Sequence, residues 1–472
     1  MFLGKTRRIH FIGIGGAGMS GIAEVLINQG YEVTGSDLSR SPVTEHLEKA
    51  GATIHYGHAA RNVADCQVVV TSSAVKADNV EVKAARDQSV PVIRRAEMLA
   101  ELMRMKYGIA IAGTHGKTTT TSLVGTLLAG GGLDPTVVIG GKLKSVGSHA
   151  QLGQSQFLVA EADESDGSFL KLTPTVVVVT TLDEEHMEFY GTLDTMKEAF
   201  LSFINKVPFY GTAVLCLDEV EIQSLIPHVE KRFITYGLTS QADYTARNIR
   251  FKGLDTWFDV FHQGRSLGTL HSVAPGRHNV LNTLAAVAVA MELNLTFDIL
   301  ADALKQFRGV QRRFEIIHDT EPLVVVDDYG HHPVEIQATL RTVREVWPDR
   351  RLVVVFQPHR YSRTKSLLKQ FWSSFHHADH VIVNDIYAAG EDPIEGVTAE
   401  RLVEGIKDFG HKHVEHRKDR NDTQDRLTHL LQPGDVLLTL GAGNIWELGR
   451  ELIANLPAGL RGGNAGKDAS AC

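Results

Sequence analysis

The feature that most constrains the fold is a glycine-rich loop at residues 113–120, which reads GTHGKTTT. An apolar run at 107–112 precedes it, and a helical pattern with Leu123, Leu127 and Leu128 follows. A strand, a phosphate-binding loop and a helix in this order are a building block of parallel α/β sheets. The loop is an imperfect P-loop, because Ile111 stands where the pattern has its first glycine. The sequence therefore predicts a nucleotide-binding α/β domain around this loop.

The residue types in the loop indicate ATP. Gly116 belongs to a turn whose N–H groups can cradle phosphate, Lys117 supplies a cation for the β- and γ-phosphates, and Thr118 supplies a hydroxyl for Mg²⁺. We therefore expect ATP and Mg²⁺ to bind through Gly113, Thr114, His115, Gly116, Lys117, Thr118 and Thr119.

A second glycine-rich loop lies near the N-terminus. Residues 13–18 fit the pattern G-x-G-x-x-G between a predicted strand at 8–14 and a predicted helix. Such a loop holds a diphosphate through its N–H groups, and Asp37, after the next strand, can bind a ribose hydroxyl. A nicotinamide dinucleotide, another diphosphate nucleotide such as a nucleotide sugar, and a purely structural glycine turn all fit this pattern.

Acidic residues follow two strands predicted for the central sheet, at 157–160 and 175–180. Because the carboxyl ends of parallel strands face the ligand crevice, carboxylates there are suited to binding the Mg²⁺ of ATP. Each single acid is also compatible with a solvated helix cap, so the individual roles stay open. The two groups are Glu161, Asp163, Glu164 and Asp166, and Asp183, Glu184, Glu185 and His186.

Length and periodicity predict three α/β domains in the 472 residues. They are a Rossmann-like N-terminal domain at 1–95, a central P-loop domain with a mostly parallel sheet at 96–311, and a Rossmann-like C-terminal domain at 312–456. Within the central domain, residues 214–271 are expected to form an antiparallel insert. A following helix is expected to bury one stripe, made of Leu281, Leu284, Ala285, Ala288 and Met291. The tail at 457–472 has no periodicity and is expected to be disordered.

Composition excludes some classes of function. The formal net charge of −8 and the absence of a strongly basic segment argue against nucleic-acid binding. No apolar run reaches the roughly 18 to 20 residues of a membrane span, so we expect no membrane insertion. The three cysteines, Cys66, Cys216 and Cys472, have no metal-binding spacing and indicate a reducing compartment. We therefore expect a cytoplasmic protein.

Cationic groups gather in the predicted C-terminal domain. Arg308, Arg312 and Arg313 precede it, and the segments 327–333 (DDYGHHP) and 357–363 (QPHRYSR) each follow a predicted strand. Arginines at a strand end suit a carboxylate or phosphate ligand, although plain surface loops remain an alternative. The paired histidines lack a third ligand at a zinc spacing. From the residues alone, the chain has an ATP site, a second nucleotide site and a cationic third domain, and the reaction stays open.

At these residues the sequence resembles the Mur ligase family of peptidoglycan synthesis. The motifs follow family order from about residue 8 to 456, and they resemble most closely the branch that adds L-alanine to UDP-N-acetylmuramate. They are GIGGAGMS at 13–20, GTHGKTTT at 113–120, EADESD at 161–166, HM at 186–187, PGRHNVLN at 275–282, RRFE at 312–315, DDYGHHP at 327–333, QPHRYSRT at 357–364 and GAGN at 441–444.

The resemblance implies an ATP-dependent ligase. In that reaction the lactyl carboxylate takes the γ-phosphoryl group, the amine of alanine attacks the acyl phosphate, and a tetrahedral intermediate collapses to the amide, ADP and phosphate. This is an early cytoplasmic step of peptidoglycan synthesis. The implied catalytic residues are Lys117, Glu161, His186 and Arg313. The resemblance also implies two Mg²⁺ ions, which Mn²⁺ can replace, with Thr118, Glu161 and His186 as their ligands.

The resemblance also assigns the binding residues. Asn279, Asn282, Arg313 and Asp328 would join the ATP site. The UDP-sugar site would comprise Gly15, Gly16, Ala17, Gly18, Met19, Ser20, Asp37, Ser72 and Ser73. The amino-acid site would comprise Tyr329, His331, His359, Arg360 and Arg363, with His359 a candidate acceptor of the ammonium proton. The expected partners are the two small-molecule substrates, UDP-N-acetylmuramate and L-alanine, and the chain is expected to be a monomer or a homodimer.

One departure from the family pattern supports the alanine-adding branch. Many Mur ligases have a carbamylated lysine after the metal-binding histidine, whereas this chain has Phe200 there and Lys197 three residues away. The alternatives are a sister ligase that attaches a murein tripeptide to the same nucleotide sugar, a nicotinamide-dependent dehydrogenase, and a non-catalytic nucleotide-binding protein.

Overall fold

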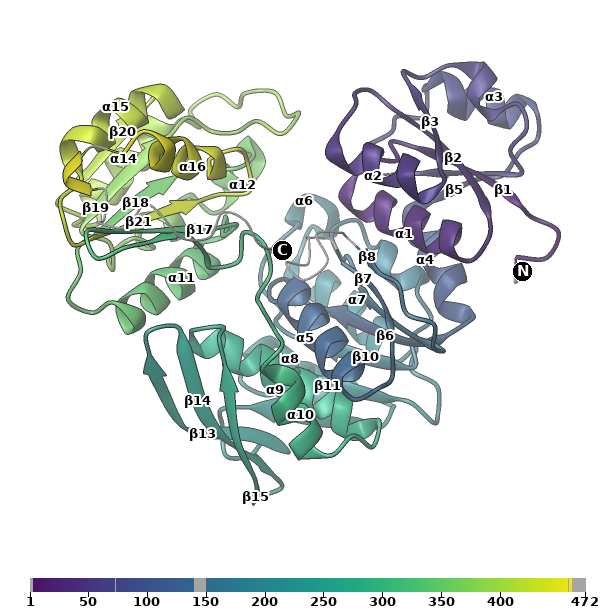
Figure 1. Cartoon of the computed structure of the whole chain (residues 1–472), viewed down its shortest axis with the longest axis horizontal. Helices are drawn as coiled ribbons and strands as arrows, with labels where there is room; N and C mark the ends of the chain where they lie inside the picture. The colour runs from purple at the N-terminus through teal and green to yellow at the C-terminus, as the bar shows by residue number, and fades with distance from the viewer. Residues whose placement is uncertain (1–2, 73, 140–149, 457, 461–472) are drawn as a thin grey trace. The chain divides into compact units, whose positions relative to one another are not determined.

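The computed structural model describes residues 3–72, 74–139, 150–456 and 458–460. It contains three β-sheets, and the chain divides into two compact units (Figure 1). The first unit holds the first two sheets and comprises the chain up to Arg250, Trp257–Val273 and Asn279–Val310. The second unit holds the third sheet and comprises Phe251–Thr256, Ala274–His278 and the chain from Gln311 on.

The first sheet is parallel throughout, as predicted, and its strand order is β3-β2-β1-β4-β5. The first strand ends two residues earlier than predicted, because Gly13 turns the chain with a φ of +76°. Its strands are β1 (Arg8–Ile12), β2 (Glu32–Asp37), β3 (Thr53–Tyr56), β4 (Val68–Thr71) and β5 (Val92–Arg94). The helices with them are α1 (Ala17–Asn28), α2 (Pro42–Ala50) and α3 (Val80–Asp87), with a 3₁₀ turn η1 (Ala60–Val63).

The second sheet has ten strands in the order β15-β14-β13-β12-β11-β10-β6-β9-β7-β8. Its central strands are fully buried apolar runs, as expected for a parallel sheet covered on both faces. The strands are β6 (Tyr107–Ala112), β7 (Thr136–Val138), β8 (Ala150–Gln151), β9 (Phe157–Glu161), β10 (Val176–Val179), β11 (Thr212–Cys216), β12 (Phe233–Gly237), β13 (Tyr244–Lys252), β14 (Asp255–His262) and β15 (Arg265–Ser272). The α-helices are α4 (Arg95–Arg104), α5 (Lys117–Gly130), α6 (Met187–Tyr190), α7 (Leu193–Ile204), α8 (Val220–Leu225), α9 (Arg277–Glu292) and α10 (Phe297–Leu304), and η2 (Ser168–Lys171) and η3 (Ile226–His228) are 3₁₀ turns.

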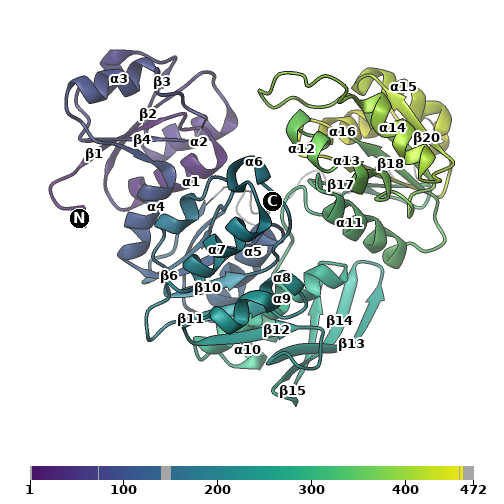
Figure 2. The ribbon, with the colours of Figure 1, turned by 180° about the vertical axis from the view of Figure 1, so that it is seen from behind.

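Two predictions for this domain were wrong in part. The antiparallel insert does not begin at residue 214, because β11, β12 and β13 pair in parallel and continue the main sheet. Only β13, β14 and β15, at the end of the sheet in Figure 2, are joined by two-residue connections, which parallel strands cannot have. Helix α9 buries nearly its whole circumference rather than one stripe, with Ala286 and Val287 at 0% exposure and Leu281 half-buried.

The third sheet has the order β16-β17-β21-β18-β19-β20, with β16 antiparallel at one edge and the other strands parallel. The predicted strands are present, whereas β16 and β20 were not foreseen, because their half-buried polar residues mask the strand pattern. The strands are β16 (Glu315–Asp319), β17 (Leu323–Asp328), β18 (Leu352–Phe356), β19 (His380–Asn384), β20 (Val414–Arg417) and β21 (Asp435–Leu440).

Helices cover both faces of this third sheet. The helices α11 (Pro333–Val346), α13 (Leu368–Trp372) and α14 (Ala399–Asp408) pack on one face. On the other face lie α15 (Arg420–Leu430) and α16 (Trp446–Ala454), and α12 (Tyr361–Ser366) follows β18. The tail was expected to be disordered, but Ala458–Leu460 form a 3₁₀ turn with Leu460 only 4% exposed, and 457 and 461–472 lie outside the described residues. No helix in the described part of the chain is long and apolar enough to cross a membrane.

Candidate functional site

The first glycine loop connects β1 to α1, as predicted. Gly16 is the N-cap of α1, and the first turn of that helix, Ala17 to Ser20, has no acidic residue. The side chains of Met19 and Ser20 are buried. The start of a helix, with its positive partial charge, suits an anionic ligand.

Asp37 closes this loop from β2. Its Oδ2 accepts a hydrogen bond from Gly15 N at 2.8 Å, and its Oδ1 accepts one from Leu38 N at 2.8 Å. A Cβ on Gly15 would lie 2.9 Å from Asp37 Oδ2, which explains the glycine. Asp37 therefore fixes the loop conformation, a role that the sequence pattern did not suggest. Ser72 follows β4 and is half-buried, and Ser73 lies outside the described residues.

The second glycine loop connects β6 to α5. Gly113 has a φ of +132°, and a Cβ there would lie 2.1 Å from Thr180 Oγ1. Gly116 is the N-cap of α5 with a φ of +80°. Both positions therefore require glycine, and Lys117, Thr118 and Thr119 form the first turn of α5 as predicted.

Two threonines that follow β10 hold this loop, and neither was predicted as a site residue. Thr181 Oγ1 accepts a hydrogen bond from His115 N at 2.8 Å and lies 2.8 Å from Thr114 Oγ1. Thr180 Oγ1 donates to the carbonyl oxygen of His115 at 2.5 Å. A sequence signal was available, because both threonines follow the buried strand β10, where a parallel sheet places its ligand crevice.

Helix α9 brings one of the predicted asparagines against the loop. Thr120 Oγ1 donates to Asn282 Oδ1 at 3.1 Å, and Asn282 Nδ2 donates to Asn279 Oδ1 at 3.2 Å. A Cβ on Gly116 would lie 2.7 Å from Asn282 Oδ1. Residues more than 160 positions apart in sequence thus meet at the phosphate loop.

Lys117 is held by an acid whose role the sequence left open. Its Nζ lies 2.7 Å and 2.8 Å from the two carboxylate oxygens of Glu164 and donates to Gly113 O at 2.5 Å. Glu164 is 1% exposed, and burial raises its pKa to about 7 against the opposing effect of Lys117. Burial lowers the pKa of Lys117, but the negative charge of Glu164 outweighs burial and raises it, so the ammonium stays charged.

His186 stands among carboxylates. It is the residue before α6, in the left-handed conformation with φ 58° and ψ 33°. Its Nε2 lies 3.9 Å from Glu164 Oε1 and 4.0 Å from Glu185 Oε1, and its Nδ1 lies 3.7 Å from Glu188 Oε1. A non-glycine residue in this conformation is uncommon and is often found at functional sites.

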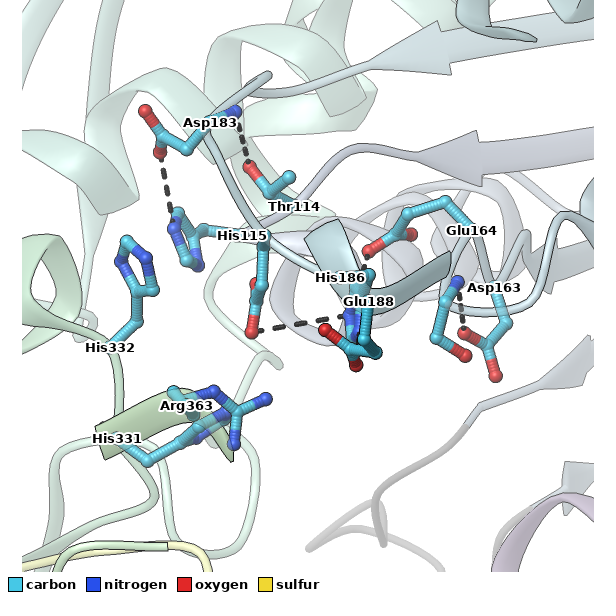
Figure 3. Close-up of polar contacts among 12 residues, drawn as sticks. Thr114, His115, Asp163, Glu164, Asp183, His186, Glu188, His331, His332 and Arg363 are labelled. Carbon is cyan, nitrogen blue, oxygen red and sulfur yellow. Dashed lines mark hydrogen bonds and ion pairs between the residues drawn. The ribbon is translucent and has the colours of Figure 1, made fainter. Parts of the chain in front are cut away.

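A second histidine contact lies beside the phosphate loop (Figure 3). His115 Nε2 lies 3.1 Å from Asp183 Oδ2, and Asp183 N donates to Thr114 Oγ1 at 3.2 Å. Asp183 therefore ties the segment after β10 to the loop after β6. Among the acids after β9 and β10, Glu164 and Glu185 thus lie near His186, Asp183 lies beside His115, and Asp163 pairs with Arg95.

This donor set fits a divalent cation. Glu161 at the end of β9, the acids near His186 and the hydroxyl of Thr118 at the start of α5 are mostly oxygen donors at the carboxyl edge of the sheet. Several carboxylates converge there on Lys117 and His186, which favours an additional positive charge. An imidazole is an unusual Mg²⁺ ligand, although it is acceptable beside oxygen ligands.

The position of the family's carbamylated lysine is apolar here. Phe200 is fully buried, with its ring centroid 5.2 Å from that of Phe169. Lys197, three residues earlier, pairs with Glu221 on α8. Neither residue therefore supplies a carbamate to the acid cluster.

In the second unit, the two arginines of 312–315 have different roles. Arg312 donates from Nε to Asp327 Oδ2 at 3.1 Å and from Nη2 to Gly441 O at 2.5 Å, so it fixes the loop after β21. Both arginines lie over the ring of Tyr329, at 5.0 Å and 5.1 Å from its centroid, whereas Arg313 Nη1 also lies 3.4 Å from Glu335 Oε1. Asp328 accepts hydrogen bonds from two backbone N–H groups at 2.7 Å, and burial raises its pKa to about 6 against the effect of Arg313.

Of the five residues predicted to bind the amino acid, four lie in contact with one another: Tyr329, His331, His359 and Arg363. The ring centroids of His331 and His359 are 6.0 Å apart, and those of Tyr329 and His331 are 5.4 Å apart. Arg363 Nη1 lies 3.4 Å from His359 Nδ1. Burial lowers the pKa of His359 to about 3, helped by His331, Arg363 and Arg360, so its ring is neutral near pH 7. Arg360, the residue before α12, has a φ of +72° and donates its backbone N–H to Tyr387 O at 2.8 Å.

Tyr387 and a cavity beside it were not predicted. The ring of Tyr387 stacks on His359 with centroids 5.5 Å apart. A cavity of about 300 Å³ opens at the carboxyl ends of β18, β19 and β21, and Gln357 Nε2 donates to Asn444 Oδ1 at 3.1 Å in its wall. Its lining includes Gln357, Asn384, Tyr387, Lys418, Arg420 and Asn444. The sequence signal was present, since 357–364 and 441–444 are both family motifs.

Three family models match the three segments of the chain that form the three sheets. The chain matches the model of the Mur ligase family, catalytic domain, over residues 8–107. It matches the Mur ligase middle domain over 111–290 and the Mur ligase, glutamate ligase domain over 312–443.

Curated relatives match over nearly the whole chain. The UDP-N-acetylmuramate–L-alanine ligase of Geotalea uraniireducens (strain Rf4) is 58% identical over 457 residues, which cover 97% of this chain and 100% of that protein. The protein of the same name from Geobacter sulfurreducens (strain ATCC 51573 / DSM 12127 / PCA) is 57% identical over 454 residues, covering 96% and 98%.

Solved structures confirm the predicted three-domain α/β fold. The UDP-N-acetylmuramate–alanine ligase of Thermotoga maritima has a TM-score of 0.81 and 30% identity, covering 95% of this chain and 98% of that one. A murein peptide ligase of Psychrobacter arcticus 273-4 has a TM-score of 0.69 at 24% identity over 95% and 98%, a likeness that shows the fold alone. From its three matched domains and its near full-length relatives, this chain belongs to the Mur ligase family.

Proposed function

We propose that this protein is an ADP-forming ligase that uses ATP to join L-alanine to the lactyl carboxylate of UDP-N-acetylmuramate. The observation that carries the proposal is the 58% identity, over 97% of the chain, to a ligase named for that reaction. The murein tripeptide ligase is the second candidate, supported by likeness to two solved structures at 24% and 28% identity. A nicotinamide-dependent dehydrogenase is not favoured, because the Lys117–Glu164 site has no function in it.

The phosphate loop supports the first step, transfer of the γ-phosphoryl group to the lactyl carboxylate. Two anions must approach each other, so the step needs positive charge in a site that excludes water. Lys117 is charged and half-buried, and Glu164 holds it beside the loop, so it can supply this charge. Asn279 and Asn282 are assigned to ATP together with the loop itself, as are Arg313 and Asp328 of the second unit.

Thr118, Glu161 and His186 are the proposed ligands of Mg²⁺, with two ions expected and Mn²⁺ as a substitute. The bound metal supplies charge neutralisation for the phosphates and the substrate carboxylate. Glu164 contributes indirectly, because it orients Lys117 and lies within 4 Å of His186.

The second step, attack by the amine of alanine, is assigned to the third domain. Arg360 and Arg363 offer paired N–H donors for the amino-acid carboxylate, with Tyr329 and His331 beside them. Neutral His359 is the proposed acceptor of the ammonium proton, which would free the attacking lone pair. Because its pKa is about 3, the ring is a weak base in this structure, and this role requires the alanine carboxylate to offset the charge of the arginines. The cavity next to Tyr387 opens at this edge of the sheet, and none of the five residues proposed for the amino acid lines it.

The nucleotide sugar is assigned to the first domain. Gly15, Gly16, Ala17, Gly18, Met19 and Ser20 would hold its diphosphate, with Asp37, Ser72 and Ser73 nearby. The three domains proposed from the sequence are residues 1–95, 96–311 and 312–456. A cytoplasmic location and a monomer or homodimer complete the proposal.

Phosphate release from ATP and Mg²⁺ tests the function directly. The enzyme is supplied with UDP-N-acetylmuramate and with L-alanine, with the tripeptide, or with no acceptor. We expect release only with UDP-N-acetylmuramate and L-alanine together. Release only with the tripeptide would move the protein to the sister ligase, and no release under any condition would contradict both ligase assignments.

A further inference from the structure

Arg95 lies between the start of α1 and the acids that follow β9, and no motif assigns it a role. It is the first residue of α4, and its side chain is 27% exposed. One side of its guanidinium faces α1 and the other side faces the acids after β9.

On the side that faces α1, Arg95 packs against Gly18. A Cβ on Gly18 would lie 2.6 Å from Arg95 Nη1 and 3.0 Å from its Cδ. Gly18 is in the first turn of α1, where the helix carries positive partial charge and no acidic side chain. Arg95 also begins its own helix, α4. A cation beside two helix N-termini is unfavourable by itself, and an anionic ligand at the loop would reverse that.

On the second side, Arg95 Nη2 donates to Asp163 Oδ2 at 2.9 Å. Asp163 directly precedes Glu164, the residue that holds Lys117. Asp163 thus connects Arg95 to the segment that holds the lysine of the phosphate loop.

We propose that Arg95 bridges the nucleotide-sugar site and the ATP site: its Nη1 side binds the diphosphate of UDP-N-acetylmuramate while its Nη2 holds Asp163. This inference rests on the proposed function and adds to it a residue that makes binding of one substrate affect the other. A planar guanidinium can contact two anions in fixed directions, whereas the single ammonium of lysine can supply the charge without the fixed bridge.

The test is binding of UDP-N-acetylmuramate to the full chain, measured by calorimetry without ATP at two salt concentrations. Arg95→Ala and Arg95→Lys are compared with Arg94→Ala, a neighbouring exposed arginine at the start of the same helix. We expect roughly 10- to 100-fold weaker binding in Arg95→Ala, from loss of a charge-assisted hydrogen bond. The affinity of that variant should also depend less on salt, which a purely structural role of Arg95 would not produce. Arg95→Lys should recover part of the affinity, and Arg94→Ala should match the wild type.

The bridge is tested by coupling between the two substrates. In the wild type, UDP-N-acetylmuramate should change the affinity for a non-hydrolysable ATP analogue several-fold, and in Arg95→Lys by less than about twofold. Equal binding in Arg95→Ala and the wild type, or an equal loss in Arg94→Ala, would overturn the diphosphate role, and coupling unchanged in Arg95→Lys would overturn the bridge. If the wild type did not bind UDP-N-acetylmuramate at all, the proposed function itself would fail.

Discussion

The buried carboxylate of Glu81 leads to a prediction about the stability of the first domain. Glu81, in the first turn of α3, is fully buried. It accepts hydrogen bonds from Ser36 Oγ and Asn62 Nδ2, both at 2.6 Å, and from Ala59 N at 3.2 Å. His58 Nδ1 lies 3.2 Å away. Glu81 therefore ties α3, the segment 58–62 and β2 together.

The size of the effect follows from the pKa of Glu81. Burial alone would raise it, but His10, whose Nε2 lies 3.7 Å away, and the hydrogen bonds from Ser36 and Asn62 outweigh burial and lower the pKa from 4.5 to about 2. This difference corresponds to about 3 kcal/mol of unfolding free energy at neutral pH. Because the folded-state pKa is the lower one, the contribution is complete above pH 4.5 and is lost as the pH falls toward 2. About 0.8 kcal/mol is lost by pH 4 and about 2 kcal/mol by pH 3.

Glu81→Gln should remove this contribution with little change in shape. Because a three-domain chain does not unfold in one step, the measurement is hydrogen exchange of peptides from β1 and β4. At pH 7 we expect exchange through local opening to be roughly 100-fold faster in the variant, and the difference from the wild type to shrink as the pH approaches 3. Glu45→Gln is the matched control, since Glu45 also lies in the first turn of a helix but is 47% exposed.

Two results would refute the reasoning. An equal acceleration in Glu45→Gln would mean that loss of an acid at a helix N-terminus explains the effect. A difference between Glu81→Gln and the wild type that stayed constant from pH 7 to pH 3 would mean that ionisation of Glu81 does not contribute.

Three further predictions concern the candidate site. Lys117→Met should lower phosphate release about 100- to 1,000-fold in the assay with both substrates, through loss of charge stabilisation, and a variant of wild-type rate would exclude Lys117 from the chemistry. Gly113→Ala should abolish binding of an ATP analogue, because its Cβ would meet Thr180 Oγ1 at 2.1 Å, whereas Gly132→Ala, at another positive φ with open space around it, should bind normally. His359→Asn should lower the rate at saturating L-alanine if His359 accepts the proton, and a higher KM with an unchanged rate would restrict it to binding.

Much of the fold and the location of the site were predictable from sequence. The loops at 13–18 and 113–120 have glycines at positions where the chain turns with positive φ, and buried apolar runs mark the strands of the parallel sheets. These signals are local, since backbone conformation and periodicity depend on a few neighbouring residues. Where local signals were mixed, as in β16, β20 and the segment 214–271, the prediction failed or was incomplete.

Partner choice was decided only by the tertiary structure. The motif at 161–166 contains four acids, and nothing in its spacing shows that Glu164 holds Lys117 while Asp163 turns to Arg95. Thr181, Tyr387 and Glu81 likewise have roles that depend on segments far away in sequence. The sequence by itself determined most of the helices and strands and which polar side chains lie at their ends. The packing of distant segments determined which charged groups meet, because burial makes each of them require a specific partner.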